Sequence, residues 1–133
     1  AFIGWVDTTA AITGEPSSNV NTVYVGCDEA DTNLAICSND GAGAAACATL
    51  GASFPCKTDN VFLDVWFYAP PNGSYINWYV ENLSTPASAA GQLTTELPVN
   101  TVQLNWQMGL NTGATTTTAV RAGFLGTCAI GNL

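Results

Sequence analysis

Basic side chains are nearly absent from this sequence. Lys57 and Arg121 are its two basic residues, histidine is missing, and ten acidic residues give a net charge of −8. A nucleic-acid binder needs a cation for each phosphate that it neutralises, and an anionic membrane surface attracts the same residue types. The composition therefore argues against both partners. Without histidine, Ser-His-Asp triads, Cys-His pairs and histidine-ligated metals are excluded.

Charged residues of either sign and long apolar runs are also scarce. Only 9% of the 133 residues are charged and 47% are hydrophobic, yet no apolar run approaches the roughly 20 residues of a membrane helix. We expect one domain over residues 1–133, no membrane insertion, and an extracellular surface of Thr, Ser, Asn, Gly and Ala. The chain lacks a signal-peptide pattern and opens on a strand-like stretch. Ala1 is therefore expected to be a processed end or part of a longer chain.

The five cysteines form no CxxC pair, and a structural zinc site would need four of these scattered thiolates. Disulfides are the favoured use; the alternative is that all five are reduced and buried. Two bridges can be drawn in fifteen ways. One pairing has a geometric argument, because a hairpin turn over residues 40–43 would place Cys37 directly opposite Cys47. Cys27 and Cys56 are the further disulfide candidates, without an assigned partner.

Residues 61–83 carry the clearest structural pattern. Leu63, Val65 and Phe67 alternate with Asp64, Trp66 and Tyr68, and a second alternating run follows from residue 75. A period of two with β-branched and aromatic residues predicts strands. The intervening Pro-Pro-Asn-Gly-Ser removes backbone donors and accepts positive φ, so we expect the chain to reverse there.

The rest of the chain reads as further short strands separated by turns. Gly, Pro and Asn-rich turn signals recur every eight to twelve residues, and no segment predicts a confident helix. The expected strands are the two of the 61–83 hairpin together with residues 2–6, 20–27, 33–38, 44–50, 92–96, 101–108 and 115–130. About nine strands with one apolar face each predict an all-β, two-layer antiparallel β-sandwich, jelly-roll or concanavalin-like. A closed barrel is the alternative.

Candidate catalytic and metal-binding residues are few. The acidic loop with Asp28, Glu29 and Asp31 is the one concentrated set of carboxylates, and a solvated loop explains it more simply than glycosidase chemistry. Asp28, Asp31 and Asn33 offer oxygen ligands for calcium, although their spacing matches no EF-hand. We therefore predict no catalytic residues and no cofactor other than this candidate calcium site.

The aromatic residues around the hairpin are the candidate contact residues. Trp66, Tyr68, Tyr75 and Tyr79 could stack on sugar rings, but core packing or a subunit interface is the favoured interpretation. Asp64 lies among them, either on a solvated face or paired with Arg121.

The order of several motifs resembles the virion structural proteins of tailed bacteriophages. The matching segments are VGCDEADTN, an Asn-Asp-Gly turn, LGASFP, LDVWFYAPPNG, TELP and LNWQMGLNTG. The resemblance covers nearly the whole chain. The cysteines and the CAIGNL ending depart from the pattern of that family.

The resemblance implies a non-enzymatic β-sandwich on the virion exterior, in a tail fibre, spike or capsid decoration. It implies a homo-oligomer, with a trimer favoured, in contact with other virion proteins, and the cysteines as stabilising cross-links. Two alternatives remain open: a glycan-binding module for attachment to the host surface, and a subunit of a cellular surface or pilus-like filament.

Overall fold

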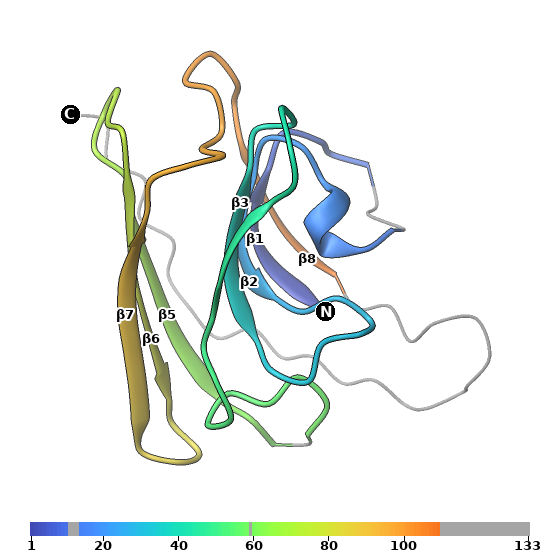
Figure 1. The fold of residues 1–133 in the computed structure, drawn as a ribbon, viewed down its shortest axis with the longest axis vertical. Coiled ribbons are helices and arrows are strands. Elements are labelled where there is room, and N and C mark those ends of the chain that lie inside the picture. The colour runs from blue at the N-terminus through green and yellow to red at the C-terminus, as the bar shows by residue number, and fades with distance from the viewer. Residues whose placement is uncertain (11–13, 59, 110–133) are drawn as a thin grey trace.

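The computed structural model describes residues 1–10, 14–58 and 60–109, and this part of the chain folds into two facing antiparallel sheets (Figure 1). Its helical content is the three-residue 3-10 helix η1, and no described helix has the length and apolar character to span a bilayer. The elements are β1 (Phe2–Val6), η1 (Pro16–Ser18), β2 (Thr22–Gly26), β3 (Ala35–Asn39), β4 (Ala46–Thr49), β5 (Leu63–Tyr68), β6 (Ile76–Asn82), β7 (Ala87–Leu93) and β8 (Asn105–Gly109).

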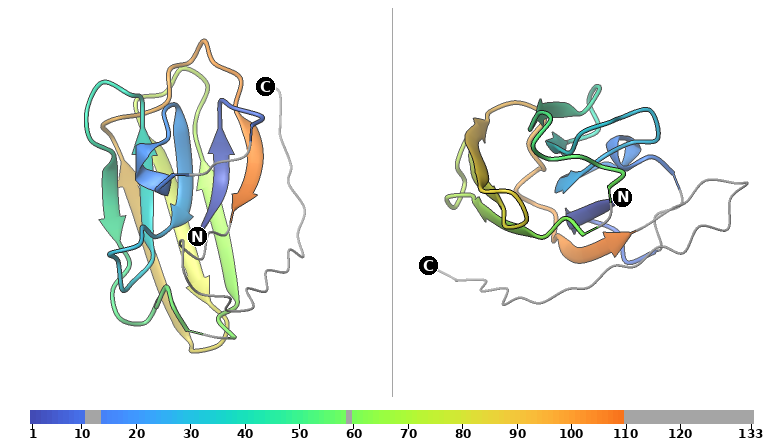
Figure 2. Two further views of the ribbon diagram at one scale, coloured as in Figure 1. Left: turned by 90° about the vertical axis from the view of Figure 1, so that its right-hand side faces the viewer. Right: turned by 90° about the horizontal axis from the view of Figure 1, so that it is seen from below.

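The strands form two layers with simple connections. One sheet has the order β4-β3-β2-β1-β8 and the other the order β5-β6-β7, and every pairing is antiparallel. Consecutive strands pair as hairpins within each sheet, and β8 returns beside β1 (Figure 2). The predicted all-β sandwich is confirmed, with eight strands among the described residues. The ninth predicted strand, 115–130, lies outside them.

The main hydrophobic core fills the space between the two sheets. Val23, Val25 and Ile36 contribute from the five-stranded sheet, and the opposite sheet contributes Ile76, Trp78 and Val80. The ring of Trp5 meets the ring of Phe67 edge-on across the layers, with 5.5 Å between centroids. Each sheet needs this contact because its apolar face cannot be left in water.

The hairpin over residues 61–83 is confirmed, with the predicted residues on each face. Trp66 pairs with Tyr79 across β5 and β6, and Phe67 pairs with Trp78. Even-numbered residues of β5 are exposed and odd-numbered ones pack toward the core. In the connection, the Gly73 N–H donates to the Pro70 carbonyl over 2.9 Å, and Asn72 adopts a φ of 52°. Asparagine tolerates that conformation, so the chain reverses where predicted.

Buried polar side chains stabilise the loops at both ends of the sandwich. Asn82 ends β6 with its amide donating to the Ser53 carbonyl over 2.7 Å, while its oxygen accepts from the Ser84 N–H over 2.9 Å. Ser38 on β3 donates to the Thr95 carbonyl over 3.1 Å. Because buried polar atoms are costly without partners, these bonds hold the connections between the sheets in fixed positions.

Two strand predictions were wrong in their limits. The strand expected at 92–96 is β7, which already begins at Ala87, and the strand expected at 101–108 is β8, which begins only at Asn105. Ser, Ala and Gly have low strand propensity, so the sequence indicated a break before residue 92. Packing overrides that propensity, because alternate residues of β7 lie against β6 and the core.

Candidate functional site

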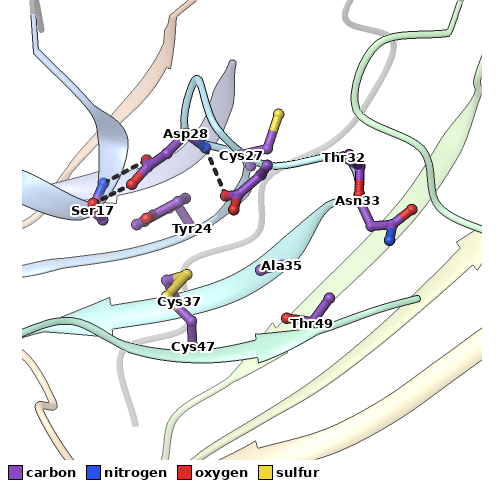
Figure 3. Close-up of a pocket in the computed structure, with 12 residues that line it drawn as sticks. Ser17, Tyr24, Cys27, Asp28, Thr32, Asn33, Ala35, Cys37, Cys47 and Thr49 are labelled. Atoms are coloured by element: carbon purple, nitrogen blue, oxygen red, sulfur yellow. Dashed lines mark hydrogen bonds between the residues drawn. A yellow bond between two sulfur atoms is a disulfide. The ribbon is translucent and has the colours of Figure 1, made fainter. Parts of the chain in front are cut away.

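A small cavity of about 250 Å³ lies on the outer face of the five-stranded sheet, beneath η1 (Figure 3). Tyr24 and Ala35 line it from β2 and β3, with Thr49 from β4 and Ser17 from η1. The segment carrying η1 covers β2 and β3, so both strands are buried along their whole length. The lining of this cavity combines carboxylate, hydroxyl and sulfur groups.

A disulfide between Cys37 and Cys47 forms part of the wall of this cavity. The two residues are directly opposed in the β3–β4 register, with Cα atoms 4.2 Å apart. The turn between these strands places them there, as predicted from the position of the Asn-Asp-Gly signal. This bridge confirms the geometric prediction and joins an edge strand to its buried neighbour.

The candidate calcium ligands are engaged in other bonds. Asp28 accepts hydrogen bonds from the backbone N–H and the hydroxyl of Ser17, the former over 3.1 Å, and Asp31 accepts from the Asp28 N–H over 2.9 Å. The Asn33 amide points away from the Asp28 carboxylate (Figure 3). Among the described residues, no group of three or more His, Cys, Asp and Glu is arranged to hold a metal. Calcium binding stays a prediction, and the loop already has an internal structural role.

Tyr24 is the buried titratable group of the cavity. Burial, followed by the negative charges of Asp28 and Asp31, raises the pKa of its phenol well above the ordinary value. At neutral pH the side chain is therefore a neutral phenol, which packs edge-on against Phe2 with ring centroids 6.2 Å apart. Such a group stabilises the outer cluster and is poorly suited to act as a base or nucleophile.

Cys27 and Cys56, the other disulfide candidates, are both thiols in this structure. Burial and a hydrogen bond with Cys27 raise the pKa of the Cys56 thiol to about 12. A thiol with such a pKa is almost wholly protonated at neutral pH and reacts slowly as a nucleophile. The sequence did not predict a contact between Cys27 and Cys56. Cys128 lies outside the described residues.

The outer face of β5 and β6, with the two residues that flank it, carries an exposed apolar surface. We call it the aromatic face. Its members and their exposed fractions are Phe62 (65%), Trp66 (67%), Tyr68 (56%), Tyr79 (37%) and Leu83 (61%). The pairing of Trp66 with Tyr79 and the bond from the Leu83 N–H to the Phe62 carbonyl bring them together. A cluster of large exposed apolar side chains is a candidate interaction surface.

Polar groups lie among these apolar side chains. Asp64 stands directly opposite Glu81, and Glu81 accepts a hydrogen bond from the Tyr79 hydroxyl over 3.4 Å. On the neighbouring strand, the Gln92 amide donates to Asn77 over 2.8 Å. Asp64 itself is exposed on this face. Arg121, the partner considered for it in the sequence, lies outside the described residues.

Three of the four candidate aromatic contact residues are exposed, so core packing, one of the two favoured interpretations, does not account for them. Trp66, Tyr68 and Tyr79 share the aromatic face, whereas Tyr75 is half-buried in the hairpin connection. Phe62 and Leu83 were missed as contact residues, although strict alternation along residues 61–83 already put them on the same face. The cavity was also missed, because its cover depends on a loop packing onto a sheet.

Comparison of the chain with protein-family models, with curated proteins and with solved structures found no match. The resemblance to phage virion proteins therefore stays a prediction that depends on the order of its motifs.

Proposed function

We propose that this chain is a non-enzymatic structural module on the exterior of a phage particle, which assembles through the aromatic face. The aromatic face is the observation that carries the proposal, because it leaves five large apolar side chains more than a third exposed. A disulfide and a surface poor in charge are typical of proteins that work outside the cell. The motif order supports the choice of a phage particle.

The charges on the aromatic face favour one mode of assembly. Asp64 and Glu81 are neighbours there. Among the described residues, Lys57 is the one basic side chain, and it donates to the Glu29 carbonyl instead. A two-fold contact between identical aromatic faces would bring four carboxylates together without a cation from the described part of the chain. Burying like charges in this way is unfavourable. We therefore propose that the aromatic face docks against a different surface of the next subunit.

A second apolar surface is present at β8, the last strand of its sheet among the described residues. Met108 there is 45% exposed, and Trp106 is also partly exposed beside it. Docking of the aromatic face onto this edge is a head-to-tail contact, which closes into a ring when the rotation per subunit permits. A trimer is the smallest ring of this kind and agrees with the expectation from the phage resemblance.

Paired variants test this assembly. Trp66→Ser should abolish self-association by removing the most exposed ring of one surface, and Met108→Ser should weaken it at the other. When mixed in equal amounts, the two variants should form a one-to-one dimer, because one intact surface of each kind remains. Sedimentation velocity measures all three samples. A strictly monomeric parent protein at high concentration would overturn the proposal, and a mixture that stays monomeric would overturn the head-to-tail arrangement.

The alternative, glycan recognition for host attachment, is favoured by a separate observation. The Asn77–Gln92 amide pair and the Tyr79–Glu81 hydrogen bond lie beside the exposed rings, and sugar hydroxyls require such groups next to a stacking surface. Glycan-array binding that is lost in Trp66→Ser and kept in Val99→Ser, an exposed apolar residue elsewhere, would support it. An array without signal would reject it.

A further inference from the structure

Cys27 and Cys56 lie side by side where the N-terminus joins the five-stranded sheet. Cys27 follows β2 directly, its N–H donates to the Ala1 carbonyl over 2.8 Å, and its own carbonyl accepts from the Ala1 ammonium over 3.1 Å. Cys27 is buried in the main core, and Cys56 packs against the same core. The thiols hydrogen-bond to each other.

Backbone contacts hold Cys56 in this position independently of its side chain. The Cys56 N–H donates to the Thr32 carbonyl over 3.0 Å, and Asn33 forms an antiparallel bridge with Pro55. The Leu34 N–H also donates to the Phe54 carbonyl over 2.7 Å. Residues 54–56 therefore pair antiparallel with residues 32–34 through backbone hydrogen bonds, and these contacts bring Cys56 to Cys27.

We propose that Cys27 and Cys56 form a second disulfide of the mature protein. An S–S bond replaces the two S–H bonds. The two electrons and two protons pass to a disulfide oxidant, either a protein or a small molecule, whose own S–S bond is reduced to two thiols. The Cys37–Cys47 bridge in the same chain already requires an oxidant of this class.

The geometry selects this pairing from the remaining arrangements. With Cys37 and Cys47 bonded to each other, Cys27, Cys56 and Cys128 can be paired in three ways. The Cys27 sulfur points away from the Cys37–Cys47 disulfide (Figure 3), and Cys56 is its hydrogen-bond partner. The pairing leaves Cys128 as the unpaired cysteine of the chain.

The second bridge would close a longer loop than the first. It encloses β3, β4 and the Cys37–Cys47 hairpin, and it links the residue that binds the N-terminus to the connection between the two sheets. Cross-linking a longer loop removes more conformational freedom from the unfolded chain. Because Cys27 is buried and the pKa of the Cys56 thiol is raised, exchange between them in the folded state is slow, and we expect the bond to form while the chain folds.

Thiol counting and peptide mapping on the oxidised full chain test the assignment. Alkylation of the denatured, unreduced protein should label one of the five cysteines. Cleavage at Asp28, Asp40 and Leu50, with a protease specific for aspartate and one that cuts after bulky apolar residues, separates Cys27, Cys37, Cys47 and Cys56 into different peptides. A linked peptide pair that contains Cys27 and Cys56 is expected. Three labelled thiols, or a link from either residue to Cys128, would overturn the proposal.

Thermal unfolding provides a second readout that does not depend on mapping. The double variant Cys27→Ser/Cys56→Ser keeps only the Cys37–Cys47 bridge. Reduction lowers the Tm of both proteins, and the decrease in the parent should exceed that in the double variant by on the order of 10 °C. Cys128→Ser is the matched control and should behave as the parent. Equal reductive shifts in the parent and the double variant would show that these thiols stay unbonded. If the double variant does not fold, the thiol count of the parent still decides the matter.

Discussion

Asp40 and Glu96 place two carboxyl groups against each other where the β3–β4 turn meets the segment after β7. Within the described residues, no N–H or O–H group donates to Glu96 Oε2, which is buried. The hydrogen bond with Asp40 raises the pKa of Glu96. The Ala42 N–H, followed by the bond with Glu96, lowers the pKa of Asp40. A protonated Glu96 that donates to an ionised Asp40 accounts for all of these features.

This carboxyl pair predicts a contribution to stability that depends on pH. A raised pKa stabilises the fold while Glu96 is protonated, and that contribution is lost as pH rises through its folded pKa. The lowered pKa of Asp40 stabilises the fold while Asp40 is ionised, and that contribution is lost as pH falls through its folded pKa. The pair therefore stabilises the fold most between the two folded pKa values, and less above the higher value or below the lower one.

Glu96→Gln tests this prediction, because glutamine keeps an N–H donor at every pH. Urea unfolding of the variant from about pH 4 to pH 7 should show a smaller loss of stability toward neutral pH than the parent protein shows. Glu29→Gln, in an exposed loop, is the control and should keep the slope of the parent. Parallel curves for parent and Glu96→Gln would contradict the shared proton.

At the scale of single elements, β7 shows how one glycine accommodates the largest core side chain. Gly91 is directly opposite Trp78 in the β6–β7 register. A Cβ atom at Gly91 would lie 2.4 Å from Cζ2 of the Trp78 ring, well inside normal contact distance. The strand therefore needs glycine at a position where strand propensity would favour a larger residue.

Gly91→Val is expected to destabilise the protein by about 1–3 kcal/mol, because the indole has to move within a packed core. Ala90→Val, whose side chain points outward from the same strand, should change stability by less than about 0.5 kcal/mol. Urea denaturation of the two variants measures the difference. Equal stabilities would show that the core around Trp78 is loosely packed.

The short β3–β4 hairpin and the β5–β6 hairpin could be predicted because their signals are local. Two strands joined by a turn have their register set by the turn, so the opposition of Cys37 and Cys47 followed from the position of Asn-Asp-Gly. The limits of β7 and β8 did not follow from local signals. Their ends depend on which residues find partners in β6 and β1, and these partners are chosen by the packing of the whole sheet.

At the scale of the whole molecule, the net charge of −8 opposes association of identical subunits. Raising NaCl from about 0.02 M to about 0.5 M should screen this repulsion and shift the protein toward the oligomer. Binding of a neutral oligosaccharide to the aromatic face should change little over the same range. Sedimentation velocity and glycan titration at both salt concentrations distinguish the two functions. A subunit equilibrium that weakens with salt would contradict assembly through an apolar face.

The alternation of apolar and polar residues by itself determined the β-sandwich, the facing of the central hairpin and the Cys37–Cys47 opposition. These features follow from a side-chain period of two and from turns whose residues are adjacent in sequence. Only the tertiary structure decided the covered outer face of β2 and β3, the approach of Cys27 to Cys56 and the Asp40–Glu96 pair. Each of these joins segments distant in sequence, so it depends on how loops and sheets pack, which no local pattern encodes.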